Sequence, residues 1–106
     1  MKKIECLIRP DRLKDLTDAL KKVPIGGLTV SDVRGFGVQR TRPDSFLFVH
    51  KVKLEIYCKE AHVNPIISTI LMYCSTGKMG DGKIAVLPMD DCVRVRTGER
   101  KNKAVG

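Results

Sequence analysis

The chain has 106 residues, of which 42% are hydrophobic and 30% charged, and its net charge is +8. This length and composition predict one globular domain, and no apolar run approaches the ~20 residues that a membrane helix needs. Without a long apolar region near Met1 we expect a cytosolic protein, and the charge favours anionic partners such as nucleotides, nucleic acid or an acidic membrane surface.

The first third of the chain predicts a strand, a helix and a second strand. Residues 4–8 alternate between apolar and other side chains, as in a half-buried strand. After Pro10 the apolar residues follow a helical stripe, which consists of Leu13, Leu16, Leu20 and Val23. Pro24 and the glycines after it end this helix. An extended pattern resumes over residues 28–33.

The rest of the chain predicts two further strands and a second helix. Alternation is strict over residues 51–58, the clearest strand signal in the sequence. Residues 60–75 carry apolar side chains at helical spacing, and residues 83–87 form an apolar strand. A short extended piece is expected at 93–96. The tail, residues 100–106, has no periodicity and is expected to fray.

The order of these elements is β-α-β-β-α-β, which predicts an α+β, ferredoxin-like domain over residues 1–106. In this fold two helices cover one face of a four-stranded antiparallel sheet. The other face would carry Leu7, Thr29, Tyr57 and several charges. Because such a half-apolar face is costly to leave in water, we expect it to pack on another subunit.

The run Thr76-Gly-Lys-Met-Gly-Asp-Gly-Lys83 joins the second helix to the last strand. Glycines allow positive φ, successive backbone N–H groups form an anion nest, and lysines add charge, so the run suggests a phosphate site. It is not a P-loop, because its glycines precede a strand rather than a helix. The alternative is a flexible hairpin-like turn with solvated lysines.

Taken together, these motifs make the chain resemble the PII signal transduction proteins, a family of small trimeric sensors of adenine nucleotides and 2-oxoglutarate. The resemblance extends from Met1 to Glu99. The motifs that carry it are Ile8-Arg-Pro10, Gly27-Leu-Thr-Val30, Gly35-Phe-Gly37 with Gln39, Lys51-Val-Lys-Leu-Glu55, Thr76-Gly-Lys-Met-Gly-Asp-Gly-Lys-Ile84 and Arg94-Val-Arg-Thr-Gly-Glu99.

The resemblance implies a binding site for ATP or ADP, with AMP as a third candidate and Mg²⁺ accompanying ATP, in the cleft between the subunits of a homotrimer. The implied nucleotide-binding residues are Thr29, Gly35, Gly37, Val38, Gln39, Tyr57, Gly80, Asp81, Gly82, Lys83, Arg94, Val95 and Arg96. Residues 76–83 would be the B-loop, and residues 93–106 the C-loop with its tail. Gln39 and Lys51 would contact 2-oxoglutarate or another small anion.

By the same resemblance, the segment at 38–50 corresponds to the T-loop, the part of PII proteins that binds their targets. In this chain the segment departs from the family pattern. It is several residues shorter than usual and lacks the tyrosine that many bacterial members have uridylylated. Val38 replaces the usual arginine, and Ala85 replaces an aromatic residue. We therefore expect weak discrimination of ATP from ADP and AMP, since a charged phosphate contact is worth roughly 1.5–3 kcal/mol.

The same segment suggests a surface for a partner. The first interpretation of Leu47 to Val49 is the start of the following strand. In the alternative, the segment offers a partner the contact residues Arg40, Arg42, Phe46 and Phe48. The partner would be an ammonium transporter, another transporter or a metabolic enzyme in nitrogen or carbon metabolism, so the protein would be cytoplasmic or membrane-associated through a transporter. An alternative is a sensor of ADP, AMP or bicarbonate that controls a non-ammonium transporter.

Catalysis, metal binding and nucleic-acid binding are not expected. No nucleophile motif occurs, and an aspartate in a glycine turn usually caps its own backbone rather than acting as a base. The four cysteines are widely spaced within apolar stretches, which predicts buried structural thiols without metal or redox roles. An RNA reader on this fold needs aromatic side chains on its sheet, and only Tyr57 could serve.

Overall fold

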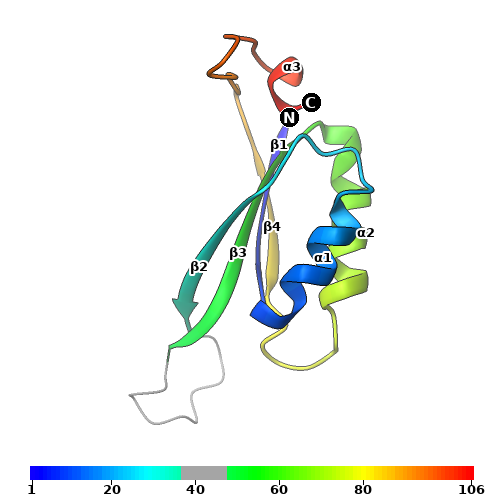
Figure 1. Ribbon diagram of the computed structural model, residues 1–106, viewed down its shortest axis with the longest axis vertical. Helices are drawn as coiled ribbons and strands as arrows, with labels where there is room; N and C mark the ends of the chain where they lie inside the picture. Colours follow the sequence, from blue (N-terminus) through cyan, green and yellow to red (C-terminus); the bar gives the residue numbers. More distant parts are fainter. Residues whose placement is uncertain (37–47) are drawn as a thin grey trace.

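The computed structural model describes residues 1–36 and 48–106, and it consists of one sheet with its two longer helices on one side (Figure 1). The strands are β1 (Lys2–Ile8), β2 (Thr29–Gly35), β3 (Val49–Cys58) and β4 (Lys83–Pro88). The helices are α1 (Leu13–Leu20), α2 (Val63–Cys74) and the short α3 (Asn102–Val105). Turns of 3-10 helix at Pro10–Arg12 and Glu60–His62 lead into α1 and α2.

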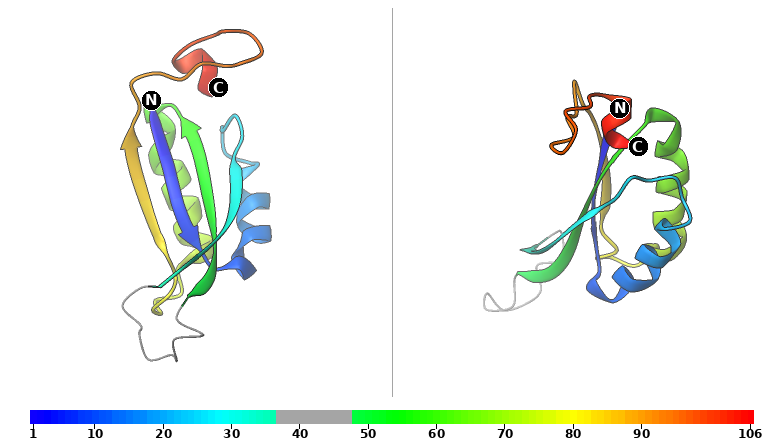
Figure 2. Two further views of the ribbon diagram at one scale, coloured as in Figure 1. Left: turned by 90° about the vertical axis from the view of Figure 1, so that its left-hand side faces the viewer. Right: turned by 45° about the horizontal axis from the view of Figure 1, so that its top comes forward.

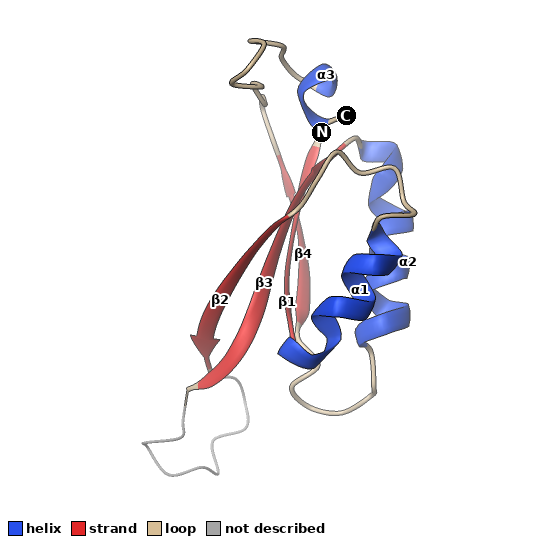
Figure 3. Ribbon diagram, in the orientation of Figure 1, coloured by secondary structure: helices blue, strands red, loops and turns tan. Residues whose placement is uncertain are grey.

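The four strands are antiparallel and lie in the order β2-β3-β1-β4. Both α1 and α2 lie on the same face of this sheet, and no described helix covers the other, here called the uncovered face (Figures 1 and 3). The predicted ferredoxin-like arrangement is thus confirmed. Within the described residues, no helix combines the length and the apolar character needed to cross a bilayer.

The core lies between the sheet and these two helices. Every second residue of β1 and β3 points into it, and the most deeply buried strand residues are Ile4, Cys6, Ile8, Leu54, Ile56 and Cys58. Leu16 and Leu20 of α1 and Ile66 and Ile70 of α2 cover them. Each such side chain contributes about 1.5–3 kcal/mol when it leaves water, so the alternation seen in the sequence determines which face the helices cover.

The uncovered face carries apolar residues around a group of four charges. Leu7 and Tyr57 are 38% and 47% exposed there, as predicted. The four charged residues form a ring of ion pairs, namely Lys3–Glu5, Lys3–Glu55, Lys53–Glu5 and Lys53–Glu55, with N–O distances of 2.9–3.6 Å. The hydrogen bond from Lys3 lowers the pKa of Glu55. Because its charges are already paired, this face can be covered without leaving an isolated ion.

Two predictions about the C-terminal part of the chain are wrong. Residues 93–96 are not a strand, because Val93 makes a single bridge to Arg100 and the chain turns between them. The tail does not fray: it ends in α3, whose Val105 is 5% exposed. The tail is held by long-range contacts with Gly26 and Arg94, which local periodicity cannot reveal.

Candidate functional site

The glycine-rich loop has a defined path that requires its glycines. Gly77, Gly80 and Gly82 have φ values of +79°, +93° and +111°. A Cβ on Gly82 would lie 1.7 Å from the carbonyl oxygen of Leu7, so only glycine fits where the loop enters β4. The flexible-turn alternative predicted no such constraint.

Asp81 ties the loop together from inside. Its carboxylate accepts hydrogen bonds from the Thr76 backbone N (2.7 Å), the Thr76 hydroxyl (2.5 Å) and the Gly77 backbone N (2.9 Å). These bonds, first those from Thr76, hold the pKa of Asp81 at about 2. The prediction that this aspartate caps its own loop is confirmed, and its oxygens are engaged in that role.

Two cations hold the loop against the sheet. The Arg9 guanidinium donates to the Met79 carbonyl oxygen at 2.7 Å and lies 3.4 Å from Asp81. Lys51 Nζ donates to the Gly80 carbonyl oxygen. Burial, followed by the charge of Arg9, lowers the pKa of Lys51. Lys51 was predicted as an effector residue and does lie at the loop. The role of Arg9 was missed, since its partners lie about 70 residues away.

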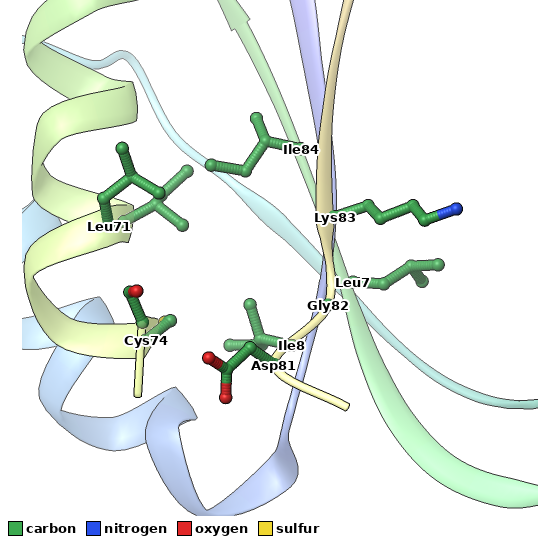
Figure 4. A pocket seen from close by; sticks show the side chains of 10 residues that line it. Leu7, Ile8, Leu71, Cys74, Asp81, Gly82, Lys83 and Ile84 are labelled. Carbon is green, nitrogen blue, oxygen red and sulfur yellow. The ribbon is translucent and has the colours of Figure 1, made fainter. Parts of the chain in front are cut away.

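Lys83 points away from the helices, toward the uncovered face. In Figure 4 the side chains of Lys83 and Leu7 extend to one side of the strands, while Ile84, Leu71 and Cys74 lie on the helix side. A cavity of about 300 Å³ lies at this end of the sheet, and Cys74 and Ile84 belong to its largely apolar wall. Asp81, Gly82 and Lys83 also line this cavity, while the Lys83 side chain itself extends toward the uncovered face.

A second cavity, of about 430 Å³, lies at the opposite end of the sheet. Its lining comes from the turn before β2, from β3 and from the C-terminal residues, namely Gly26, Gly27, Leu28, Thr29, Glu55, Tyr57, Arg94, Ala104, Val105 and Gly106. The predicted residues Thr29, Tyr57 and Arg94 are thus brought together. Glu55 was missed as a lining residue, although it is two positions from Tyr57 on the same face of a strand and pairs with Thr29.

Arg94 contacts the tail rather than the glycine-rich loop. Its guanidinium donates to the carbonyl oxygens of Lys103 (3.2 Å) and Gly106 (2.8 Å) and lies 4.0 Å from Glu99. The chain turns just after it, and Val95 is fully exposed there. Arg96 is also exposed in that turn. These contacts leave Arg94 in the wall of the second cavity.

The predicted nucleotide-binding residues therefore form two separate groups. Along β1, Lys83 pairs opposite Leu7 whereas Tyr57 pairs opposite Lys3, which separates them by about 13 Å of strand. Thr29 lies farther still, because β2 and β4 are opposite edges of the sheet. The glycine-rich loop lies at one end of the sheet and α3 at the other (Figures 1 and 2). One chain does not unite the two groups.

Several predicted residues belong to the segment before β3. Gly35 is the last residue of β2 and pairs with Val49, the first of β3, so Val49 belongs to the strand, as the strand-start reading of this segment predicted. Phe48 is 56% exposed, and its ring makes an edge-on contact with Phe36 at 5.4 Å. Its role with a partner stays a prediction. Outside the described residues lie Gly37, Val38, Gln39, Arg40, Arg42 and Phe46.

The cysteines are free thiols, three of them buried. Burial raises the pKa of Cys6 to about 11, and it also raises the pKa values of Cys58 and Cys74. Such thiols are unreactive, as their apolar sequence context predicts. Across residues 1–36 and 48–106, no three His, Cys, Asp or Glu side chains are grouped as a metal site would require.

Comparison with known proteins gives one consistent result. The family model described as "Nitrogen regulatory protein P-II" matches residues 1–99. A P-II homolog of Arabidopsis thaliana is 49% identical over 110 residues, covering 96% of this chain, which spans 56% of that relative's length. The P-II protein of Synechocystis is 39% identical, with 99% of this chain and 100% of the relative covered.

Solved structures agree with the sequence comparison. The crystal structure of Arabidopsis thaliana PII bound to citrate has a TM-score of 0.84 and 50% identity, with 97% of this chain and 90% of that chain covered. The matched residues 1–99 include the glycine-rich loop, both cavities' strands and Arg94. The chain belongs to the nitrogen regulatory PII protein family.

Proposed function

We propose that this chain is a non-catalytic PII regulator that binds an adenine nucleotide between neighbouring subunits of a homotrimer. Bound nucleotide would bias the T-loop segment and so alter contact with a transporter or enzyme of nitrogen or carbon metabolism. The observation that carries the proposal is the separation of the predicted binding residues into two groups at opposite ends of the sheet.

The glycine-rich loop suits the phosphates. Its positive-φ glycines expose backbone to a ligand, and Lys83 supplies a charge on the uncovered face. Asp81, Arg9 and Lys51 already fix the loop's shape, so binding would require little ordering of it. A preorganised loop of this kind favours an anion over a neutral ligand.

The second cavity suits the nucleoside. Its volume of about 430 Å³ falls in the usual range for small-molecule sites. Tyr57 offers an aromatic face, Thr29 a hydroxyl and Glu55 a carboxylate acceptor. Arg94 would reach the phosphates from this side, as a planar guanidinium does well.

A ring of chains would join the two groups. Both edge strands, β2 and β4, are unpaired on their outer sides within the described residues. A head-to-tail contact that places the β2 edge of one chain beside the β4 edge of the next closes into a cyclic oligomer. Such a ring would also cover Leu7 and Tyr57 on the open face. The homotrimer implied by the family resemblance has this symmetry.

Isothermal titration calorimetry with ATP, ADP and AMP, each with and without Mg²⁺, tests the nucleotide proposal. We expect binding of at least one of them with one site per chain, and weak discrimination among them because Val38 replaces an arginine. Absence of binding by all three would refute the nucleotide site. A strong preference for ATP would refute only the reasoning about Val38. Native mass spectrometry of the same sample tests the trimer.

A small carboxylate is the proposed second ligand. The related Arabidopsis thaliana PII crystallised with citrate, a small polycarboxylate, bound to it. In this chain Arg9 and Lys51 converge on the glycine-rich loop and would attract 2-oxoglutarate or a similar anion. Titration of 2-oxoglutarate, citrate and bicarbonate into the nucleotide-loaded protein, with Lys51→Met as the comparison, tests this. Equal binding of these anions by the wild type and Lys51→Met would show that Lys51 is not part of the carboxylate site.

The partner surface is proposed to be the T-loop segment, about 38–50, with Phe48 at its described end. Deleting residues 40–48 should abolish capture of a transporter or enzyme partner while leaving the oligomer intact. Capture that survives the deletion would place the partner surface elsewhere on the molecule.

A further inference from the structure

The C-terminal strap, defined as residues 101–106, accepts hydrogen bonds from Arg94, the cation in the wall of the second cavity. Arg94 is the only Lys or Arg among the described residues that line this cavity. Its guanidinium already donates to the carbonyl oxygens of Lys103 at 3.2 Å and Gly106 at 2.8 Å. A phosphate can take the same N–H donors only if these two bonds are given up.

Packing holds the strap in this position. Val105 is 5% exposed, although it belongs to a helix of only four residues. The strap lies so close to the turn before β2 that a Cβ on Gly26 would be 2.8 Å from the Val105 carbonyl oxygen. Ala104, Val105 and Gly106 thereby form one wall of the cavity.

The start of the strap has the geometry of a strained hinge. Lys101 has φ +57°, the one positive φ among the described non-glycine residues. Its backbone N donates to the Cys92 carbonyl oxygen at 2.8 Å, and the neighbouring Arg100 is paired with Asp91. Arg100 is anchored to Asp91 and bridged to Val93 independently of residues 102–106, and release of those residues would relieve the strain at Lys101.

We propose that the C-terminal strap is an autoinhibitory element that competes with nucleotide for Arg94, so that nucleotide binding and strap docking oppose each other. This inference rests on the proposed nucleotide site and adds a regulatory step to it. Because coupling between two binding events is reciprocal, removal of the strap tightens nucleotide binding, and nucleotide releases the strap to the same degree.

The first test compares ADP dissociation constants by calorimetry in two variants, a chain that ends at Arg100 and full-length Val105→Asp. Both should bind ADP roughly five- to thirtyfold more tightly than the wild type, the effect of releasing two hydrogen bonds of ordinary strength. Truncation also removes two lysines, which by simple charge attraction would weaken ADP binding, so the sign of the change is informative. Lys103→Ala keeps the carbonyl that Arg94 contacts and should bind as the wild type does.

The second test uses the unaltered protein, so it does not depend on any variant folding. Trypsin cleavage within the strap, followed by intact-mass spectrometry, should be faster at saturating ADP than without it. Unchanged or weaker ADP binding in both strap variants, or protection of the strap by ADP, would overturn the inference. If the wild type binds ADP but the strap variants and the trypsin experiment contradict the inference, the proposed nucleotide site still stands. If the wild type binds no nucleotide, the proposed function itself fails.

Discussion

The glycine-rich loop at one end of the sheet and the cavity at the other differ in how they hold their charged groups. In the loop, Asp81, Arg9 and Lys51 bond to the loop's own backbone and fix its shape. In the cavity, Arg94 bonds to the C-terminal tail. In the proposed function, the loop is therefore preorganised for phosphate, whereas the tail must leave Arg94 before nucleotide can bind at the cavity end.

The largest expected effect tests the loop's fixed shape. In Gly82→Ala the new Cβ would meet the Leu7 carbonyl oxygen at 1.7 Å with φ +111°. We expect the free energy of unfolding to fall by about 3 kcal/mol or more, with loss of nucleotide binding. Urea denaturation measures the first effect and calorimetry the second.

Gly77→Ala is the matched control for that variant. Its φ is +79°, but nothing lies within 4 Å of its added Cβ, so only the conformational strain of about 1–2 kcal/mol is expected. Equal losses in the two variants would contradict the claim that close approach to β1 defines the loop's path.

The next effect separates the two lysines of the loop. Lys83→Met removes the charge on the uncovered face and should weaken nucleotide binding roughly ten- to hundredfold. Lys78→Met removes an equal charge from an exposed position, where its backbone N donates to the Thr76 hydroxyl. It should change the affinity little. Calorimetry on both variants distinguishes a specific contact from general charge attraction, which would make the two effects similar.

The smallest effect is the pH response of Asp81. Its pKa in the folded protein is about 2, below its ordinary value of 3.8, so folding favours the charged carboxylate. The stabilisation is complete above about pH 4 and is lost as the pH falls toward 2. The amide NMR shifts of Thr76 and Gly77 should titrate together with a midpoint near 2 and not at all in Asp81→Asn. A midpoint near 3.8 would contradict the capping role.

Sequence periodicity predicted those elements whose order depends on neighbours in the chain. Alternation over β3 and the apolar stripe of α1 correctly identified Leu54, Ile56, Leu16 and Leu20 as core residues. The tail was mispredicted because Val105 is buried by contacts with residues far away in the sequence. Helix and strand patterns carry no information about such contacts.

The candidate site was also predicted only in part, because some of its residues act on partners far away in the sequence. The glycine pattern and Asp81 are local signals: the glycines adopt positive φ and Asp81 caps its own loop, while their contact with phosphate stays a prediction. Arg9 gave no local signal, since it acts on Met79. Motif resemblance named residues such as Lys83 and Tyr57 without indicating that, within one chain, they lie toward opposite ends of the sheet. Only strand register reveals that separation.

Mixed oligomers of two weakened variants test the central claim, that each nucleotide site combines the glycine-rich loop of one chain with the opposite end of another. Lys83→Ala and Arg94→Ala chains, each expected alone to bind ADP at least roughly tenfold more weakly than the wild type, are unfolded together in equal amounts and refolded. If neighbouring chains share each site, about one quarter of the sites in the mixture have both residues intact and bind ADP with wild-type affinity. If each site lies within one chain, no mixture regains binding, and that result would contradict the account.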